Sequence, residues 1–110
     1  MSFVYLASPY SHADPAVREE RYRQACKAAA RLMLAGEVVF SPIAHSHPIE
    51  TVGIGEVKSG AFWKSQDMGI LIHAAKLVVL KLPGWEASSG IRWEIETAHN
   101  LSMPVEFIDP

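Results

Sequence analysis

The chain has 110 residues, of which 49% are hydrophobic and 20% are charged. This size and composition fit one soluble domain over residues 1–110 with a single core, and they leave no room for a second domain. The ten basic residues are spread along a chain of net charge −2. The sequence therefore carries no electrostatic footprint for a nucleic acid polymer or an acidic membrane, and a small-molecule partner is the better expectation.

Cys26 is the single cysteine, which excludes a disulfide framework and a zinc site built on cysteines. No run of 18 apolar residues occurs, and the N-terminus lacks the basic segment and apolar stretch of a signal peptide. We therefore expect a cytoplasmic protein.

The first third of the sequence predicts a strand followed by a long helix. Residues 2–8 form an apolar run, which is typical of a strand buried on both faces. Asp14 followed by Pro15 is a helix start signal, and apolar residues at helical spacing then continue to Gly36, which predicts the stop.

The rest of the chain continues this alternation. Residues 38–40 predict a short buried strand, and residues 43–59 lack clear periodicity, so we expect a long loop there; long loops in small domains are often functional. Residues 62–75 predict a helix, residues 77–82 a third buried strand, and residues 103–108 a fourth strand. A further helix lies between the last two strands.

This element order predicts the α/β class. Right-handed crossovers would give a single-domain, Rossmann-like or flavodoxin-like three-layer sandwich, with a parallel sheet of about four to five strands. Ligands of such sheets bind beyond the C-terminal ends of the strands. Serine-bearing loops at residues 8–11, at Ser41 and at residues 88–89 are all expected at that edge.

The loop before the last helix has the chemistry of an anion site. Ser88, Ser89 and Gly90 lead into a helix that carries Glu94, which we place in its first turn. Free N–H groups of a first turn bind phosphate or hydroxyl oxygens, and the helix dipole is expected to keep Glu94 ionised. An ionised acid beside a sugar C1 can form a glycosyl intermediate or stabilise an oxocarbenium-like transition state. The alternative is that Glu94 only complements the helix dipole and takes no part in chemistry.

Asp67 is a second candidate. It interrupts an apolar stripe formed by Trp63, Ile70, Leu71 and Ala74 at helical spacing. A buried carboxylate needs partners, so Asp67 is expected to contact loop groups or a ligand. The alternative is a solvated position at the edge of the stripe, or a structural cap.

His45 and His47 follow the second predicted strand, where such a pair could bind a metal or contact a base. No third ligand is evident, so we predict no metal and assign His45 to substrate contact. Trp85 is expected to have a minor ligand role, since tryptophans more often pack in a core or an interface.

Read together, these motifs resemble the nucleoside 2-deoxyribosyltransferase superfamily over nearly the whole chain. The resemblance lies in Tyr5-Leu6-Ala7-Ser8-Pro9, Asp67, Ser88-x-Gly90-x-x-x-Glu94-x-x-x-Ala98 and Pro104-Val105. It is closest to a small bacterial and phage group of uncharacterised proteins, marked by the opening Tyr-Leu-Ala-Ser-Pro-Tyr-Ser and the loop Gly-Trp-Glu-x-Ser-x-Gly.

The resemblance implies cleavage of an N-glycosidic bond with Glu94 as the nucleophile and Asp67 in the sugar and base site. It also makes Tyr5 and Tyr10 candidates for a hydrogen bond to the catalytic carboxylate, and the alternative for Tyr5 is a core position in its strand. Nucleoside-specific relatives usually carry an aspartate where this chain has Ser88, so a 5′-monophosphate is implied as the ligand. Its phosphate cradle would be Ser8, Ser88 and the amides near Gly90, and the predicted substrate site as a whole is Ser8, Pro9, Tyr10, Ser41, His45, Trp85, Ser88, Ser89 and Gly90. Two departures are Glu96, where the family has glycine, and Trp93 before the glutamate.

We therefore expect a nucleotide N-glycosidase or 2-deoxyribosyltransferase that needs no cofactor. The predicted long loop, together with the resemblance to the superfamily, suggests that a neighbouring subunit completes the pocket. A homo-oligomer, either a dimer or a tetramer, is therefore expected. The alternative is a non-catalytic nucleotide-binding or sensing module of the same fold.

Overall fold

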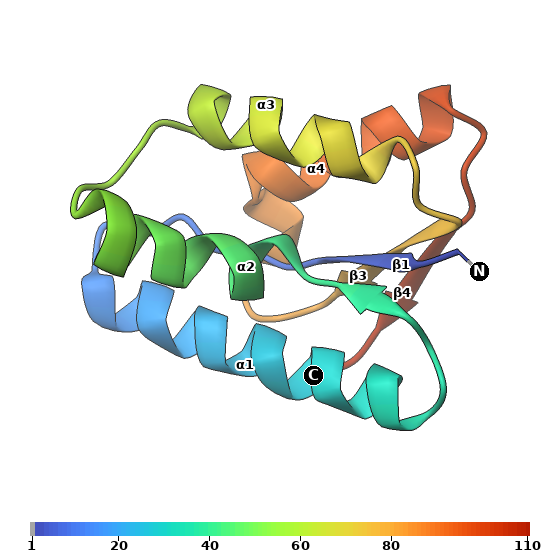
Figure 1. Cartoon of the computed structure of the whole chain (residues 1–110), viewed down its shortest axis with the longest axis horizontal. Helices are drawn as coiled ribbons and strands as arrows, with labels where there is room; N and C mark the ends of the chain where they lie inside the picture. Colours follow the sequence, from blue (N-terminus) through green and yellow to red (C-terminus); the bar gives the residue numbers. More distant parts are fainter. Residues whose placement is uncertain (1) are drawn as a thin grey trace.

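The computed structural model describes residues 2–110 as a three-layer α/β sandwich (Figure 1). The strands β1 (Val4–Ala7), β2 (Val39–Phe40), β3 (Lys76–Leu80) and β4 (Val105–Ile108) form one parallel sheet in the order β2-β1-β3-β4. Helix α1 (Pro15–Leu34) covers one face, and α3 (Gly60–Leu71) and α4 (Ser89–Asn100) cover the other. The predicted fold class is confirmed.

Side chains alternate across the sheet and build two cores. Tyr5 and Ala7 of β1 belong to the cluster under α3 and α4, whereas Val4 and Leu6 belong to the cluster under α1. All four residues of β1 are buried, which is what the apolar run predicted. Strand β2 is only half-buried because it lies at the edge of the sheet, so the prediction of a second buried strand was wrong.

The start of α1 follows the sequence signal. Asp14 is the N-cap, and its Oδ1 accepts a hydrogen bond of 2.9 Å from the Ala16 amide, while Pro15 occupies the first helical position. The helix ends at Leu34, and Gly36 follows in the left-handed conformation with φ of 98°.

Residues 43–59 do not form a long loop, and this prediction was wrong. Ser41 caps α2 (Pro42–Pro48) by accepting a hydrogen bond of 3.2 Å from the Ala44 amide, and Pro42 stands at its start. This repeats the cap-and-proline signal of α1. A π-helical segment, η1 (Ile49–Ile54), continues from α2 and ends at Gly55, whose φ is 82°. Only a short connection to α3 remains irregular.

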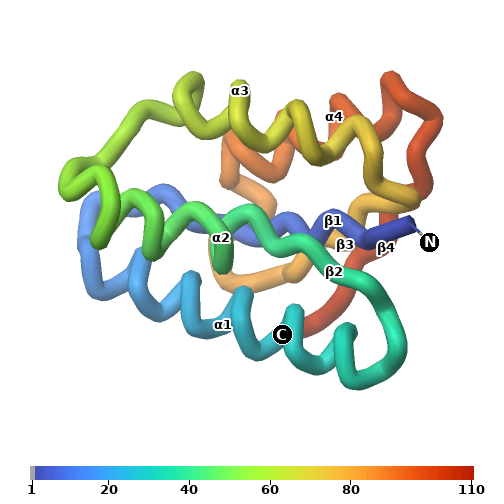
Figure 2. Tube along the Cα trace, in the orientation of Figure 1, coloured from blue at the N-terminus to red at the C-terminus, as the bar shows by residue number. Residues whose placement is uncertain are grey.

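The order of the strands shows where on the sheet a ligand is expected to bind. The chain leaves β1 for its neighbour β2 on one side, and it leaves β3 for β4 on the other. The C-terminal ends of β1 and β3 therefore flank the topological switch point, where open α/β sheets bind ligands. Figure 2 shows α2 and the segment after it running past this edge of the sheet, alongside α1. Within residues 2–110, no helix is long and apolar enough to cross a bilayer.

The cap of α1 gives a test of this fold. Asp14→Ala removes the side-chain acceptor of the Ala16 amide, and we expect the free energy of unfolding to fall by about 1 kcal/mol. Asp14→Asn keeps an oxygen acceptor and is the matched control. Urea unfolding of both variants measures the effect, and equal stability of Asp14→Ala and wild type would rule out this cap.

Candidate active site

A cavity of about 560 Å³ lies beyond the C-terminal ends of β1 and β3. Its walls come from the loop after β1, from α1, α2, η1 and α3, and from the start of α4. The structure brings seven of the predicted site residues to this cavity: Ser8, Tyr10, Asp67, Ser88, Ser89, Gly90 and Glu94. A volume of this size suits a ligand as large as a nucleotide.

Helix α4 presents its N-terminus to the cavity. Ser88 is the N-cap, and its Oγ accepts a hydrogen bond of 3.2 Å from the Ile91 amide. Its own O–H stays available as a donor, and the amides of Ser89 and Gly90 have no intrahelical acceptors. Hydroxyl and amide donors at a helix N-terminus form a site for an anionic oxygen.

Glu94 lies one turn deeper than the sequence suggested. The helix begins at Ser89, so Glu94 is in its second turn, and the first turn carries no acid. The side chain is 6% exposed but still lines the cavity. The dipole acts mainly within the first turn, so it does not keep this carboxylate ionised as expected.

Burial decides the charge of Glu94. Desolvation raises the pKa of Glu94 to about 8, the nearby Tyr5 hydroxyl opposes this rise, and the charge of Asp67 adds to it. Glu94 therefore carries a proton at neutral pH in the free protein. This is a correction of the sequence-based expectation, and its cause is the loss of water around the carboxyl group.

Asp67 is the second acid of the site. It is half-buried on α3, and desolvation raises its pKa to about 6. Asp67 is consequently ionised for most of the time at pH 7, whereas Glu94 is not. Two carboxyl groups with separated pKa values on one cavity are the usual arrangement of an acid and a base with different roles.

Two buried hydroxyl groups, one of them in the lining of the cavity, are unpaired among residues 2–110. Neither the Tyr5 hydroxyl nor Ser8 Oγ has a hydrogen-bond partner, and both are buried. Burial, followed by the charges of Glu94 and Asp67, raises the pKa of Tyr5 well above its ordinary value. An unpaired buried hydroxyl is costly, and Ser8 lines the cavity, where a ligand oxygen would satisfy it.

Four predicted substrate residues do not line the cavity. Pro9 is fully buried, and Ser41 is occupied as the cap of α2. His45 is exposed and lies against Phe40, with ring centroids 5.5 Å apart. Trp85 packs on Phe107 at 5.6 Å and faces a second, smaller cavity of about 200 Å³. The helical form of residues 42–48 explains His45, because a helix turns this side chain away from His47.

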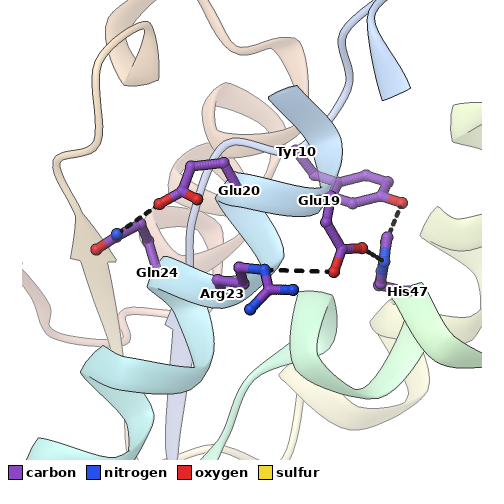
Figure 3. Close-up of polar contacts among 6 residues, drawn as sticks. All are labelled: Tyr10, Glu19, Glu20, Arg23, Gln24 and His47. Carbon is purple, nitrogen blue, oxygen red and sulfur yellow. Dashed lines mark hydrogen bonds and ion pairs between the residues drawn. The ribbon is translucent and has the colours of Figure 1, made fainter. Parts of the chain in front are cut away.

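A polar network that was not predicted from the sequence lies on the other side of the cavity. His47 is 7% exposed, and its Nδ1 lies 2.6 Å from the Tyr10 hydroxyl oxygen, while its Nε2 lies 2.7 Å from Glu19 (Figure 3). No sequence signal singled out Glu19, because an acid on the polar face of a long helix is normally solvated. His47 was weighed only together with His45, as a pair that could bind a metal or contact a base. No group of three metal-binding side chains occurs in residues 2–110.

Glu50 and Arg21 were also missed. Glu50 is 4% exposed, and it accepts hydrogen bonds from the Trp63 indole at 2.8 Å and the Lys58 amide at 3.1 Å. It thereby fixes the connection between η1 and α3. Its position in a predicted loop gave no indication of burial.

Arg21 ties two loops of the edge together. It donates hydrogen bonds to the Ser11 carbonyl at 2.9 Å and to the Pro83 carbonyl at 3.4 Å. Gly84 is required beside it, because its φ is 92° and a Cβ there would lie 2.9 Å from the guanidinium group. Arg21 thus brings a positive charge next to the loop that leads to Ser88.

Comparison with known proteins identifies the fold. The solved structure of a 2-deoxyribosyltransferase from the psychrotolerant bacterium Bacillus psychrosaccharolyticus, described as a biocatalyst for the synthesis of antiviral and antitumoral nucleosides, is similar at a TM-score of 0.68. The identity is 25%, over 99% of this chain and 73% of the other. The fold is therefore 2-deoxyribosyltransferase-like.

The chain belongs to the family described as a domain of unknown function, DUF1937, whose model matches residues 2–109. A comparison with proteins of curated function gives no match. The superfamily expected from the sequence is thus supported by the structure, and the smaller group marked by the two motifs remains a prediction.

The buried acid predicts a pH dependence of stability. The pKa of Glu94 lies at about 8 in the fold against 4.5 for an ordinary glutamate, so the unfolded chain binds fewer protons between these pH values. Stability must then fall as pH rises through this window. Glu94→Gln cannot ionise, and we expect it to be more stable than wild type at pH 8 by on the order of 4 kcal/mol.

At pH 4 the two proteins should unfold at nearly the same denaturant concentration, because Glu94 is then protonated in both states. Glu96→Gln is the matched control, since Glu96 is exposed on the same helix. A stability difference between Glu94→Gln and wild type that does not change with pH would contradict the raised pKa.

Proposed function

We propose that the protein cleaves the N-glycosidic bond of a deoxynucleoside 5′-monophosphate, as a hydrolase or a 2-deoxyribosyltransferase, with Glu94 as the nucleophile. The observation that carries this proposal is the buried Glu94 carboxyl group, which shares a cavity with Asp67 and with the N-terminus of α4. The 2-deoxyribosyltransferase-like fold supports the reaction class.

The chemistry requires an anion beside the sugar. An ionised Glu94 attacks C1′, the bond from C1′ to the base nitrogen breaks, and positive charge develops on the sugar ring in the transition state. Low local dielectric strengthens the attraction between this charge and the carboxylates of Glu94 and Asp67. Water or an acceptor base then attacks C1′ and releases Glu94. None of these steps calls for a cofactor.

The phosphate is assigned to the end of the cavity at α4. Ser8 offers an unpaired buried hydroxyl, and Ser88, Ser89 and Gly90 offer a hydroxyl and two amides. Ser88 is neutral, so it does not repel a phosphate as a carboxylate would. The guanidinium group of Arg21 lies beside Gly84 at the start of this loop and adds positive charge.

A non-catalytic nucleotide sensor of the same fold is the second candidate. The observation in its favour is the raised pKa of Glu94, because a protonated carboxyl group donates a hydrogen bond and is no nucleophile. The enzyme and the sensor differ in what Glu94 does: turnover needs its anion, whereas binding alone does not.

The homo-oligomer expected from the sequence remains a prediction, and sedimentation velocity tests it.

Base release distinguishes the two candidates. Wild type, Glu94→Ala and Glu94→Gln are incubated with ribo- and deoxynucleosides and their 5′-monophosphates, and free base is measured by chromatography. We expect wild type to release base from deoxynucleoside 5′-monophosphates, and each Glu94 variant to lose at least about 1,000-fold, as expected on removal of a nucleophile. Binding of the nucleotides without release of any base would leave the sensor as the function.

The acid pair also predicts the pH profile of the enzyme. The value of kcat/KM should rise with pH and level off above a pKa of about 8, because only the anion of Glu94 attacks C1′. The charge of Asp67 contributes to that pKa, so Asp67→Asn should move the midpoint to lower pH. An unchanged midpoint in Asp67→Asn would show that the two carboxyl groups do not interact.

A further inference from the structure

Two side chains on the wall of the cavity, Glu50 and Tyr10, have no part in the reaction proposed above. Both line the cavity, and Glu50 is 4% exposed. Burial and then the charge of Glu50 raise the pKa of Tyr10, so the two groups lie near each other. The hydrogen bonds that each group already makes show what it can offer to a ligand.

One oxygen of the Glu50 carboxylate is occupied and the other is not. Oε2 accepts hydrogen bonds from the Trp63 indole at 2.8 Å and from the Lys58 amide at 3.1 Å. Such N–H donors stabilise the anion of a carboxyl group, which can only accept. Oε1 has no donor among residues 2–110, yet it is not one of the buried polar atoms without a partner. Oε1 therefore keeps accessible surface, and it is an acceptor for a ligand in the cavity that Glu50 lines.

Tyr10 offers an acceptor as well. His47 Nε2 lies 2.7 Å from Glu19 Oε2, and His47 Nδ1 lies 2.6 Å from the Tyr10 hydroxyl oxygen (Figure 3). The carboxylate of Glu19 cannot donate, so the single hydrogen of a neutral imidazole is on Nε2. Nδ1 then accepts the O–H of Tyr10, which turns this hydrogen away from the cavity. Tyr10 therefore presents the lone pairs of its oxygen to a ligand.

An aromatic ring lies next to these acceptors. Trp63 is half-buried in the cavity wall, and its hydrogen bond to Glu50 holds the indole beside the carboxylate. Bases stack on such rings and are recognised through hydrogen bonds at their edges. In Figure 2 the green segment after α2, which carries Glu50, lies at the left of the view, and α4 begins nearer its centre. The acceptors are thus at a different end of the cavity from the proposed phosphate site.

Two other charged groups of the cavity have to be weighed as contacts of the base. Asp67 on α3 is a further acceptor, and the proposed function places it beside the sugar. Arg18 is a donor that opposes the rise in the pKa of Tyr10, and its Nη1 donates to the His12 carbonyl. Arg18 would bind a carbonyl oxygen of a base, which is the opposite preference from that of Glu50 and Tyr10.

We infer that Glu50 Oε1 and the Tyr10 oxygen bind the exocyclic amino group of the base, so that the site selects adenine, guanine or cytosine over hypoxanthine and uracil. This rests on the proposed function, because it takes the ligand to be a nucleotide. An amino group has two hydrogens for the two acceptors. A carbonyl oxygen in its place would face the lone pairs of both, with no hydrogen between them.

Glu50→Gln tests this inference because its surroundings determine how the new amide is oriented. The Trp63 indole and the Lys58 amide both donate, so the amide oxygen takes the place of Oε2. The N–H2 group then takes the place of Oε1. The variant keeps both internal hydrogen bonds and presents a donor to the ligand instead of an acceptor.

Three matched pairs of nucleotides serve as probes: dAMP with dIMP, dGMP with dIMP, and dCMP with dUMP. In the pair with the strongest preference, wild type should favour the amino base by about 100-fold in kcat/KM. Glu50→Gln should lower this ratio to about 1 or below, because an amide N–H2 repels an amino group. Tyr10→Phe removes only the second acceptor and should lower the ratio by about 10-fold.

Glu56→Gln is the matched control. Glu56 belongs to the same segment, its side chain is 71% exposed, and it pairs with Lys58 Nζ at 3.4 Å. This variant should keep the wild-type preference. If Glu50→Gln does not fold, the result for Tyr10→Phe decides, since an unchanged ratio in that variant overturns the inference.

Binding separates the inference from the proposed function. Dissociation constants of the same nucleotides are measured by calorimetry on Glu94→Gln, with and without Glu50→Gln, so that turnover does not interfere. If wild type releases no base but binding shows the preference and its loss, the proposed reaction fails and the inference holds. If no nucleotide binds, both fail.

Three results would overturn the inference alone in a protein that releases base. The first is an equal kcat/KM within every pair, or a preference for the carbonyl base, which would indicate Arg18. The second is the same loss in Glu50→Gln with every base, which would assign Glu50 to the sugar. The third is a preference that survives in Glu50→Gln and disappears in Asp67→Asn, which would assign the amino group to Asp67.

Discussion

The burial of one carboxyl group, that of Glu94, is the constraint on which the site depends. The topology of the sheet directs Tyr5 toward the same side as α4, so the second turn of α4 packs over a buried hydroxyl. Glu94 is thereby separated from water, which raises its pKa to about 8. The fold thus maintains an acid that is costly to ionise, at a point where a cationic sugar would stabilise its anion. Burial of an ionisable group at the proposed site lowers the stability of the fold above neutral pH.

The positions of the other polar groups in the cavity are set by the C-terminal ends of the parallel strands. The switch point between β1 and β3 sets Ser8 beside the loop that leads into α4. Donors for an anion therefore collect at one end of the cavity, and the carboxyl groups of Asp67 and Glu94 line the same cavity. On the opposite wall, Glu19 of α1, His47 of α2 and Tyr10 of the loop after β1 form a row of polar contacts. Anion binding and nucleophilic attack are thus proposed for two sets of elements around one cavity.

Much of the fold was predictable from local signals, and the errors have physical causes. Asp14 and Pro15 marked the start of α1 correctly, yet the same signal at Ser41 and Pro42 was overlooked because Pro48 and two glycines suggested a loop. The sequence identified seven of the residues that line the cavity. It did not predict that Glu94 is protonated, since burial arises from tertiary packing. Nor did it predict Glu19 and His47 as partners, because only the docking of α2 against α1 brings them together.

The central claim is that Glu94 forms a covalent bond with the sugar, and trapping that bond tests it most directly. Fluorine at C2′ destabilises the oxocarbenium-like transition state and slows hydrolysis of the glycosyl intermediate. Wild type incubated with 2′-fluoroarabinonucleoside 5′-monophosphates should gain the mass of the fluorinated sugar phosphate, and peptide sequencing should place it on Glu94. Glu94→Gln should gain nothing. An adduct on another residue, or none in a protein that releases base from ordinary nucleotides, would contradict the account.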